Sequence, residues 1–173
     1  INIGSGFSAT HQNACIAAEG LDNVRVIDSR NLSTGQGHVV LEACKLAKTA
    51  SSLDELCDQL NELTPRVDAS FLLDRLDYMA KGGRCSTVTL LGANLLKLKP
   101  CIEVDNTSGG MGVGKKYRGK LENVLIQYTE EKLSQYPDIR TDKIFITHSG
   151  IDPKYIQAVR KAVEKKMQFD NIY

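Results

Sequence analysis

The sequence lacks most of the features that mark specialised classes of protein. No segment approaches the ~20 consecutive apolar residues that span a bilayer, and no signal-peptide pattern is found, so we expect no integral membrane segment. Internal repeats and low-complexity stretches are also absent. The 22 basic and 21 acidic residues nearly cancel, to a net charge of +1, which excludes a general attraction to nucleic acid or to an anionic membrane. Any ligand must therefore be recognised by local features.

Cysteines are few and widely spaced. They form no CxxC pair and have no neighbouring histidine at metal-ligand spacing, so we interpret them as small buried hydrophobic residues. An odd number of cysteines in a chain of this length argues against a disulfide framework and indicates a reducing cytoplasm. The five are Cys15, Cys44, Cys57, Cys85 and Cys101.

The apolar content is sufficient for a sizeable core. Hydrophobic residues make up 42% of the chain and charged residues 25%, as in ordinary globular proteins, and 173 residues fit one or two small domains. The chain begins with Ile1 rather than methionine and ends at Tyr173 without a polar tail, so we expect it to be a piece of a longer protein. A binding site shared between lobes would then lack some of its walls.

Residues 1–65 alternate between strand and helix signals. An apolar start over residues 1–3 predicts a strand, the Ala/Ile-rich segment 8–20 predicts a helix closed by glycine, and VRVID at 24–28 predicts a second strand. Two strands joined by a helical crossover favour parallel pairing, so we predict a partial α/β lobe here. Further helices are predicted from Ser33 or Thr34 to about Ala50, and from a capping box of Ser52 and Glu55 to Pro65.

A second lobe, of α+β type, is predicted over residues 66–173. Segments 101–104 and 111–115 are predicted to pair as a β-hairpin through a glycine-containing turn at 106–110. Residues 121–135 show the pattern of an amphipathic helix. The remaining predicted elements are strands at 69–73 and 143–148, helices at 73–80 and 86–98, and a last helix opened by Pro153.

The first candidate binding motif is the small, hydroxyl-rich turn Gly4–Thr10, between the first strand and the first helix. Free amide groups at a helix N-terminus attract an anion, and the hydroxyls of Ser5, Ser8 and Thr10 can add donors for a carboxylate or a phosphate. An ordinary serine or threonine cap is the alternative interpretation.

Two segments imitate nucleotide-binding motifs. The turn matches GxGxxA, and Asp28 follows Gly6 by 22 positions, where a dinucleotide fold places its ribose ligand. Segment 109–115, GGMGVGK, satisfies GxxxxGK, but Lys116 stands where a magnesium-binding Ser or Thr is required. We interpret the second segment as a β-turn and keep a nucleotide- or phosphate-binding α/β enzyme as the alternative function.

A basic group precedes the helix at 121–135. Lys115, Lys116, Arg118 and Lys120 form it, either as a solvated helix entrance or as a contact for a phosphate or a partner. Arg118 is the preferred contact because a guanidinium group binds oxyanions bidentately.

The three histidines predict neither a metal site nor a catalytic triad. His11, His38 and His148 are far apart, and no GxSxG elbow is present. His148 follows a predicted strand, where α/β proteins place ligand loops, and is the histidine we would test.

Taken in order, these segments resemble the motifs of the DegV family over essentially the whole chain. They are Ser5–Gln12 (SGFSATHQ for SxLSGTYQ), Val26–Ser29 (VIDS), Ser33–Gly37 (STGQG for SxGxG), Leu76–Ser86 (LDYMAKGGRCS for LxYLxKGGRIS), Leu98–Pro100 (LKP for IKP), Lys116–Arg118 (KYR for KxR) and Ile146–Gly150 (ITHSG, with IxH).

The resemblance implies a two-lobe protein that binds a long-chain fatty acid and is not itself an enzyme. In such proteins the carrier presents the carboxylate to a separate ATP-dependent fatty acid kinase, and the acyl phosphate feeds phospholipid synthesis. It implies that Ser5, and then Ser8 or Thr10, bind the carboxylate, that Arg118 contacts the kinase or its phosphate, and that no cofactor is needed.

The acyl chain requires an apolar tunnel. Phe71, Leu72, Leu73 and the predicted helix at 86–98 are candidate walls, with plain core as the alternative for each residue. Two family features are missing here: an initial strand with a motif rich in Asp and Ser/Thr, and a final HxGPG segment. We therefore expect this chain to supply only part of the carboxylate site.

Overall fold

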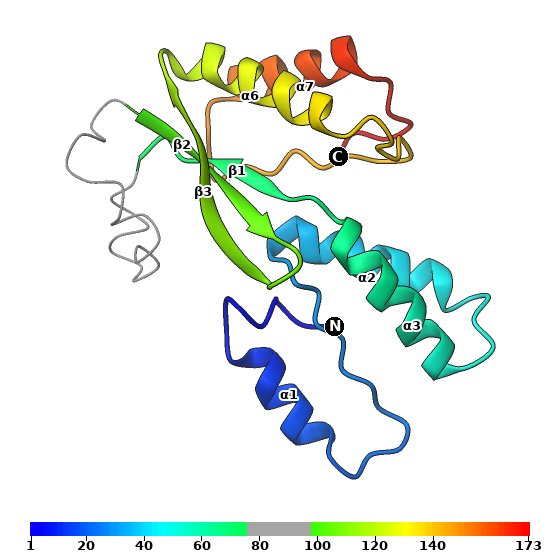
Figure 1. Cartoon of the computed structure of the whole chain (residues 1–173). Helices are drawn as coiled ribbons and strands as arrows, with labels where there is room; N and C mark the ends of the chain where they lie inside the picture. Colours follow the sequence, from blue (N-terminus) through cyan, green and yellow to red (C-terminus); the bar gives the residue numbers. More distant parts are fainter. Residues whose placement is uncertain (76–97) are drawn as a thin grey trace.

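The computed structural model describes residues 1–75 and 98–173 of the chain. Figure 1 shows α2 and α3 side by side near the N-terminus, the sheet in the middle, α6 and α7 side by side beyond it, and α1 projecting from the rest. The mixture of helices and strands confirms the predicted α/β class. The elements are α1 (Thr10–Ala18), α2 (Ser33–Leu46), α3 (Leu53–Leu63), a 3₁₀ turn (Thr64–Arg66), β1 (Ser70–Leu72), β2 (Leu98–Asp105), β3 (Gly110–Arg118), α6 (Leu121–Gln135) and α7 (Pro153–Lys166).

The two predicted helix caps of the first region differ in outcome. Ser52 caps α3, because its Oγ accepts the amide of Glu55 at 3.0 Å. The Glu55 carboxylate accepts the amide of Ser51 at 2.8 Å, one residue earlier than a standard capping box. The prediction that Ser33 or Thr34 caps α2 was wrong: the N-cap is Leu32, which has no side-chain acceptor. A serine at the start of the predicted segment therefore caps α3 but does not cap α2.

The predicted parallel strands at 1–3 and 24–28 are reduced to one parallel bridge, between Asn2 and Asp28. The amide of Asn2 donates to the carbonyl before Asp28 at 3.0 Å, and its carbonyl accepts the amide after Asp28 at 3.3 Å. Arg30, with φ of 48°, then turns the second segment away. The parallel direction was therefore predicted correctly, but the length of both strands was not.

Strands β1, β2 and β3 form an antiparallel sheet in that order. The predicted hairpin is confirmed, since β2 and β3 pair from Leu98 opposite Arg118 to Asp105 opposite Gly110. Gly109, at φ of 72°, takes the left-handed conformation that closes the turn. The GGMGVGK segment is therefore mostly β-strand and not a phosphate-binding loop leading into a helix.

One face of the sheet packs against α6. Cys101 of β2, Tyr117 of β3 and Val124 of α6 form a buried cluster, which Leu72 of β1 joins. Because side chains alternate across a strand, the neighbouring residues point to the opposite face. Between Pro100 and Ile102 the register with β3 shifts, from Pro100 opposite Lys116 to Ile102 opposite Val113. The apolar pairs on the face away from α6 are Phe71 with Ile102, Ile102 with Val113, and Val104 with Met111.

Helices α6 and α7 enclose a second apolar cluster, of Leu133, Val163 and Phe169. Helix α7 begins as predicted at Pro153, and the Asp152 carboxylate accepts the amide of the second helical residue at 3.0 Å. The predicted strand at 143–148 was wrong in extent, because its pairing is limited to a parallel bridge between Ile144 and Ile172.

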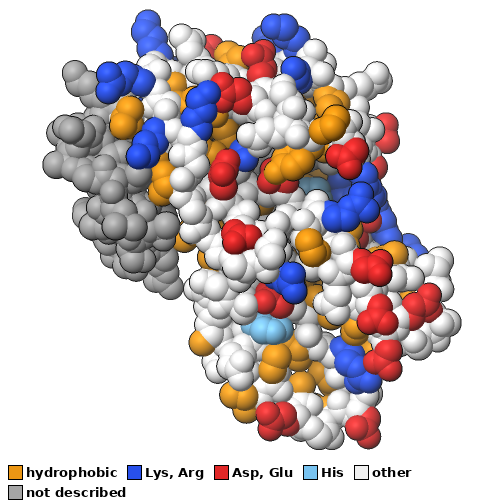
Figure 2. All heavy atoms as spheres, viewed as in Figure 1, with side chains coloured by type: hydrophobic (Ala, Val, Ile, Leu, Met, Phe, Trp, Pro, Cys, Tyr) orange, Lys and Arg blue, Asp and Glu red, His pale blue; other side chains and the backbone are white. Residues whose placement is uncertain are grey.

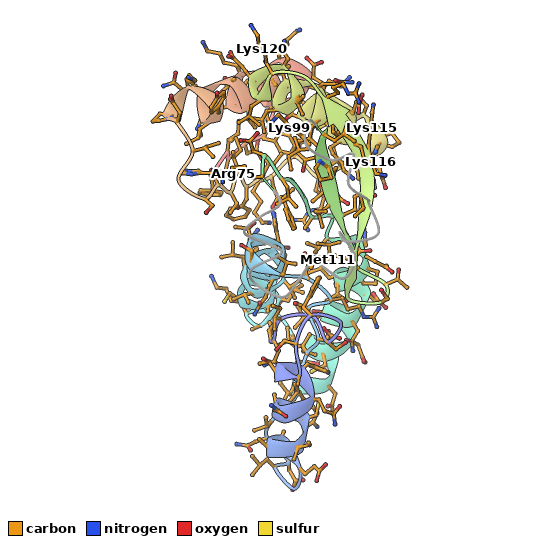
Figure 3. The ribbon with its side chains drawn as sticks, turned by 90° about the vertical axis from the view of Figure 1, so that its left-hand side faces the viewer. Arg75, Lys99, Met111, Lys115, Lys116 and Lys120 are labelled. Atoms are coloured by element: carbon orange, nitrogen blue, oxygen red, sulfur yellow. The ribbon has the colours of Figure 1, made fainter. Side chains whose placement is uncertain are left out.

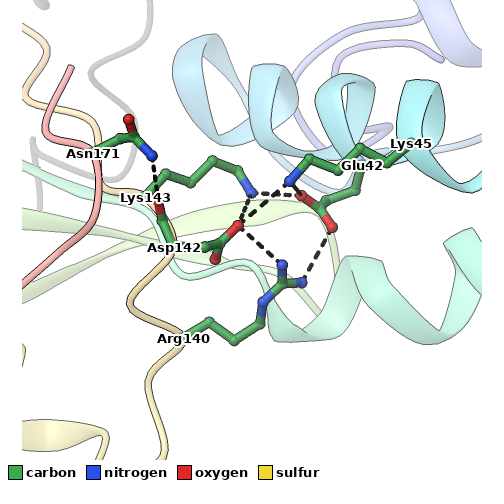
Figure 4. Close-up of polar contacts among 6 residues, drawn as sticks. All are labelled: Glu42, Lys45, Arg140, Asp142, Lys143 and Asn171. Carbon is green, nitrogen blue, oxygen red and sulfur yellow. Dashed lines mark hydrogen bonds and ion pairs between the residues drawn. The ribbon is translucent and has the colours of Figure 1, made fainter.

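An ionic cluster joins α2 to the segment that follows α6 (Figure 4). The buried carboxylate of Glu42 accepts hydrogen bonds from Lys143 at 2.5 Å, Lys45 at 3.0 Å and Arg140 at 3.2 Å. Asp142 binds the same three cations. Helices α2 and α3 themselves pack around Ile27, Val39, Leu60 and Val67.

None of the helices described in the structure is long and apolar enough to cross a bilayer. The predicted helices at 73–80 and 86–98, with the loop Lys81–Arg84 and Cys85, lie wholly or mostly at residues 76–97, outside the described part of the chain.

Candidate functional site

The hydroxyl turn lies between the Asn2 bridge and α1. Two of its three hydroxyl residues, Ser8 and Thr10, are hydrogen-bonded to each other through their hydroxyl groups at 2.7 Å. The Ser8 Oγ also accepts the amide of Thr10 at 3.2 Å, a local turn bond one residue before Ala9, the N-cap of α1, which has no side-chain cap. The next two amides, of His11 and Gln12, make no hydrogen bond to the described residues. The turn thus combines hydroxyl groups bonded to each other with two amides at the start of α1 that have no partner in the described part of the chain.

The tip of the β2–β3 hairpin touches this turn. A Cβ atom on Gly6 would lie 2.4 Å from the carbonyl oxygen of Gly109 and 2.8 Å from the amide nitrogen of Gly110. Only a residue without a side chain allows the two backbones to approach so closely. The sequence did not reveal this contact, because it joins residues more than a hundred positions apart.

A single carbonyl group holds the loops beside this contact. The side-chain amides of Asn31 and Asn106 each donate to the carbonyl oxygen of Val67, both at 3.0 Å. Asn31 is completely buried, as is Ser29, whose hydroxyl donates to the Asn31 carbonyl at 3.1 Å. Three segments far apart in the sequence therefore meet at one fixed point.

Asp28 supplies a negative charge next to the turn. Its Oδ1 accepts the amide of Ser5 at 3.2 Å and the amide of Arg30 at 2.8 Å. Partial burial acts to raise the pKa of Asp28, but hydrogen bonds from Ser5 and Arg30, aided by the nearby charge of His11, outweigh it and lower the pKa. Asp28 is consequently ionised at neutral pH, and an anion that binds at the turn must tolerate it.

Several amides of the turn are already hydrogen-bonded within the protein. The amide of Gly4 donates to the carbonyl of Asn31 at 2.8 Å, that of Phe7 to the carbonyl of Gly4 at 2.9 Å, and that of Ser5 to Asp28. A dinucleotide phosphate would need these groups free. The arrangement favours a small anion held by hydroxyls over a pyrophosphate cradled by backbone.

A row of apolar side chains begins where the hairpin meets the turn, and two of them, Ile102 and Val104, are buried. Met111 lies near the end of the hairpin that faces the N-terminal segments (Figure 3), and Val104 lies opposite it on the face away from α6. The pair Phe71 and Ile102 continues this face along the sheet. Of the candidate tunnel walls, Leu72 instead packs in the cluster beside α6. The hydroxyl turn therefore stands at one end of an apolar strip.

Arg118 lies at the other end of β3, away from the hydroxyl turn. It is exposed and lies eight positions after Gly110 along the strand, or about 26 Å at 3.3 Å per residue. Lys116 shares its face of the strand, whereas Lys115 points to α6 and pairs with Glu131 at 2.6 Å. The structure thus does not bring Arg118 to the three hydroxyl residues, and one small anion cannot contact both.

The basic group lies in the half of the molecule remote from α1. Figure 3 shows Lys99, Lys115, Lys116 and Lys120 all in that half, and Figure 2 shows several Lys and Arg side chains there with Asp and Glu side chains among them. Lys116, Arg118 and Lys120 form no ion pair with any described residue. These three cations are available to an acidic partner.

The other histidines have separate surroundings. His38 packs edge-on against Phe145, with ring centroids 4.6 Å apart, and burial together with the charge of Lys143 lowers its pKa. His148 is exposed, and it is not among the described groups that hydrogen-bond to Asp28. Within the same residues no cluster of His, Cys, Asp and Glu has the form of a metal site. His11, on the first turn of α1, is the histidine that lies beside the hydroxyl turn, and our sequence reasoning overlooked it despite its adjacent position.

Comparison of the sequence with known proteins gives one consistent family. A DegV domain-containing protein of Clostridium acetobutylicum is 40% identical over 121 residues, which are 69% of this chain and 43% of that protein. The DegV domain-containing protein YteA of Lactococcus lactis is 30% identical over 171 residues, covering 94% of this chain and 57% of YteA. The chain spans roughly half the length of the curated relatives it matches.

Solved structures of the same family have this fold. A DegV family protein from Thermus thermophilus, described as fatty-acid-binding, matches with a TM-score of 0.80 and 25% identity, covering 98% of this chain and 60% of that one. DegV of Bacillus subtilis, described as a fatty acid binding protein, matches with a TM-score of 0.72 and 26% identity, covering 98% and 61%. The family model described as "uncharacterised protein, DegV family" matches residues 1–173, and the chain therefore belongs to the DegV family.

Proposed function

We propose that this chain is the part of a fatty-acid carrier that holds the carboxylate end of one long-chain fatty acid and part of its acyl chain. The observation that carries the proposal is the contact of the hydroxyl turn, through Gly6, with the tip of a hairpin whose face away from α6 is apolar. A fatty acid has the matching shape, with one small anionic group on a long apolar tail. The fatty-acid-binding relatives from Thermus thermophilus and Bacillus subtilis support the same ligand.

In this proposal the carboxylate binds the hydroxyls of Ser5, Ser8 and Thr10. Ser8 and Thr10 share one hydrogen bond, so at least one of the two hydroxyl protons is available to a carboxylate oxygen. The acyl chain follows the pairs Val104 with Met111 and Phe71 with Ile102 along the sheet. No cofactor has a part in this binding.

We also propose the division into lobes at residues 65 and 66. The cluster around Val39 and Leu60 draws its members from the first part of the chain and from Val67, just past the boundary. The clusters around Tyr117 and Val163 draw theirs from the second part. The proposed ligand would then contact the first lobe with its carboxylate and the second with its tail.

The carrier itself would perform no chemistry. We propose that a separate ATP-dependent kinase phosphorylates the bound carboxylate, that the acyl phosphate enters phospholipid synthesis, and that the protein works in the cytoplasm, where ATP is available. Arg118 is exposed and, like Lys116 and Lys120, forms no ion pair with the residues that the structure describes, which supports a contact with an acidic surface of that kinase. Arg118 lies too far from the turn to touch the transferred phosphate when the ligand is bound as proposed.

Native mass spectrometry of the full-length protein tests the ligand. We expect a retained acyl chain that exchanges with added palmitate, and we expect the double variant Ser8→Ala, Thr10→Ala to retain about tenfold less. Ser134→Ala is the matched control, because its hydroxyl donates to a carbonyl in the exposed part of α6. A full-length protein that neither retains nor exchanges fatty acid would refute the proposal, as would stabilisation by ATP or NAD in place of palmitate.

Acyl-phosphate formation with the purified kinase tests the partner. With Arg118→Ala we expect a higher KM of the kinase for the loaded carrier and unchanged palmitate binding, because the side chain is remote from the turn. An unchanged KM would remove Arg118 from the contact.

A further inference from the structure

Helix α2 contacts the second proposed lobe along one face. Side chains four residues apart on α2 touch alternate residues of segment 143–147, which runs in the opposite direction. They pair as Thr34 with Thr147, His38 with Phe145, and Glu42 with Lys143, and we call these six residues the seam. The first pair is a hydrogen bond between hydroxyl groups at 2.8 Å, the second an edge-on ring contact with centroids 4.6 Å apart, and the third an ion pair at 2.5 Å.

Each side of the seam is fixed within its own lobe. The opposite face of α2 packs against α3 through the apolar cluster that contains Val39. In segment 143–147 the amides of Ile144 and Ile146 donate to the carbonyls of residues 171 and 173, at 2.9 and 2.7 Å. Ile144 also joins the apolar cluster between α6 and α7. A change in the angle between the lobes therefore displaces the two sides of the seam relative to each other.

The contacts between the proposed lobes are mainly polar. Among the described residues, each of the three buried apolar clusters lies within one lobe, apart from Val67 at the boundary. The approach of Gly6 to the hairpin tip involves no hydrogen bond between these two described segments. Domains that are joined without a large hydrophobic interface are expected to move relative to each other.

The proposed ligand site requires such a motion. The acyl chain is proposed to follow Ile102 and Val104, which are only 2% and 8% exposed, while its carboxylate binds the hydroxyl turn of the other lobe. A ligand held between two lobes and against buried side chains enters and leaves when the groups around it separate. The polar contacts between the lobes can break for this purpose without exposing an apolar cluster.

We infer that the seam opens and closes during exchange of the fatty acid, with the Val67 carbonyl as the pivot. Asn31 of the first lobe and Asn106 of the second both donate to this carbonyl, so the pivot stays bonded to both lobes. Opening separates one hydroxyl hydrogen bond, one ring contact and one ion pair, and water replaces the lost polar partners. The inference rests on the proposed function and on the division into lobes, and it identifies the step that controls ligand release.

A disulfide across the seam tests whether it opens. The Thr34 and Thr147 hydroxyl oxygens are 2.8 Å apart, so two cysteines at these positions are close enough for a disulfide. The full-length double variant Thr34→Cys, Thr147→Cys is loaded with palmitate under reducing conditions and then oxidised, and peptide mapping by mass spectrometry verifies the bond. We then measure the rate at which bound palmitate exchanges with deuterated palmitate.

We expect the oxidised protein to exchange palmitate about tenfold more slowly than the same protein in its reduced form. Added reductant should restore the faster rate. Because the two forms have the same sequence, the reduced form is the matched control for any effect of the substitutions themselves.

Glu42→Gln provides a second measurement, from the other end of the seam. Loss of the ion pair with Lys143 should speed the exchange of palmitate about tenfold, and adding the disulfide to this variant should abolish the increase. Glu164→Gln, whose pair with Arg160 is exposed on α7, is the control and should exchange palmitate at the wild-type rate.

The outcomes distinguish the seam from the proposed function. Equal exchange rates in the oxidised and reduced forms would show that the seam stays closed, and fatty-acid binding would stand. Failure of the two cysteines to join would contradict the contact itself, and an unchanged rate in Glu42→Gln would also refute the inference. If wild-type protein retains no palmitate, the inference and the proposed function are both refuted.

Discussion

At the scale of single residues, the approach of Gly6 to Gly109 connects the proposed carboxylate site to the apolar hairpin. The carbonyl oxygen of Gly109 occupies the position that a side chain on Gly6 would need. The identity of residue 6 therefore controls a contact between two distant segments, although it contributes no functional group of its own.

Replacing Gly6 by alanine should separate the turn from the hairpin. The new methyl group would lie 2.4 Å from a backbone oxygen. Overpacking of this kind typically lowers the unfolding free energy by about 1–3 kcal/mol. We expect a lower melting temperature and weaker palmitate binding in the full-length protein. Gly112→Ala is the control, since no described atom lies within 4 Å of its added Cβ. Equal stability of the two variants would contradict the contact.

Sequence reasoning proposed part of the candidate site. Ser5, Ser8 and Thr10 could be grouped because they are neighbours in one turn, and the structure joins Ser8 and Thr10 by a hydrogen bond. The closeness of Gly109 and the burial of the His11 Nδ1 depend on packing between remote segments. A local pattern contains no information about such contacts.

At the scale of elements, Ser52 shows how much one helix depends on its first residue. Its hydroxyl oxygen satisfies the Glu55 amide at the start of α3, and loss of an N-cap costs about 1 kcal/mol. We expect Ser52→Ala to lower the unfolding free energy by that amount in urea denaturation.

Ser33→Ala provides the comparison, because Ser33 has a similar position in the sequence but does not cap α2. We expect its effect on the unfolding free energy to stay within about 0.5 kcal/mol. A loss equal to that of Ser52→Ala would show that Ser33 does cap α2, as its sequence position suggested.

The elements that were predicted well are those stabilised by local features. The bounds of α6 follow from its amphipathic pattern, and the hairpin follows from its glycine-containing turn. Parallel pairing was harder to predict, because its partners are far apart: Asn2 pairs with Asp28, and Ile144 with Ile172. In both cases one bridge forms where a longer strand was expected.

At the scale of the whole molecule, Glu42 connects α2 to the segment after α6. Its buried carboxylate is the common acceptor for Lys143, Lys45 and Arg140. Removing one partner from such a cluster leaves the buried ammonium of Lys143 less compensated, which typically costs about 3–5 kcal/mol. We expect Glu42→Gln to lose about 3 kcal/mol at pH 7. Glu164→Gln, which breaks an exposed pair with Arg160, should lose no more than about 0.5 kcal/mol.

The same cluster should make the unfolding free energy depend on pH. Burial acts to raise the pKa of Glu42, but hydrogen bonds from Lys143, Lys45 and Arg140 outweigh it and lower the pKa from 4.5 to about 2. The pKa of Glu42 is lower in the folded protein than in the unfolded chain. The stabilisation from this carboxylate is therefore complete above pH 4.5 and is lost as the pH falls towards 2. Urea unfolding between pH 7 and pH 2 should show a shallower decline for Glu42→Gln than for the wild type. Parallel declines would contradict this assignment.

The shared acceptor at Val67 bears on how tightly a ligand is bound. With Asn31 and Asn106 both held by one carbonyl, the loops around the hydroxyl turn are ordered when the protein folds. Ligand binding then requires little further ordering of these loops. The loss of conformational entropy on binding is therefore small, and the affinity is higher than it would be with mobile loops. An asparagine to alanine change at either position should weaken the binding of palmitate through a larger entropic penalty, detectable by calorimetry, even though neither side chain belongs to the proposed carboxylate site.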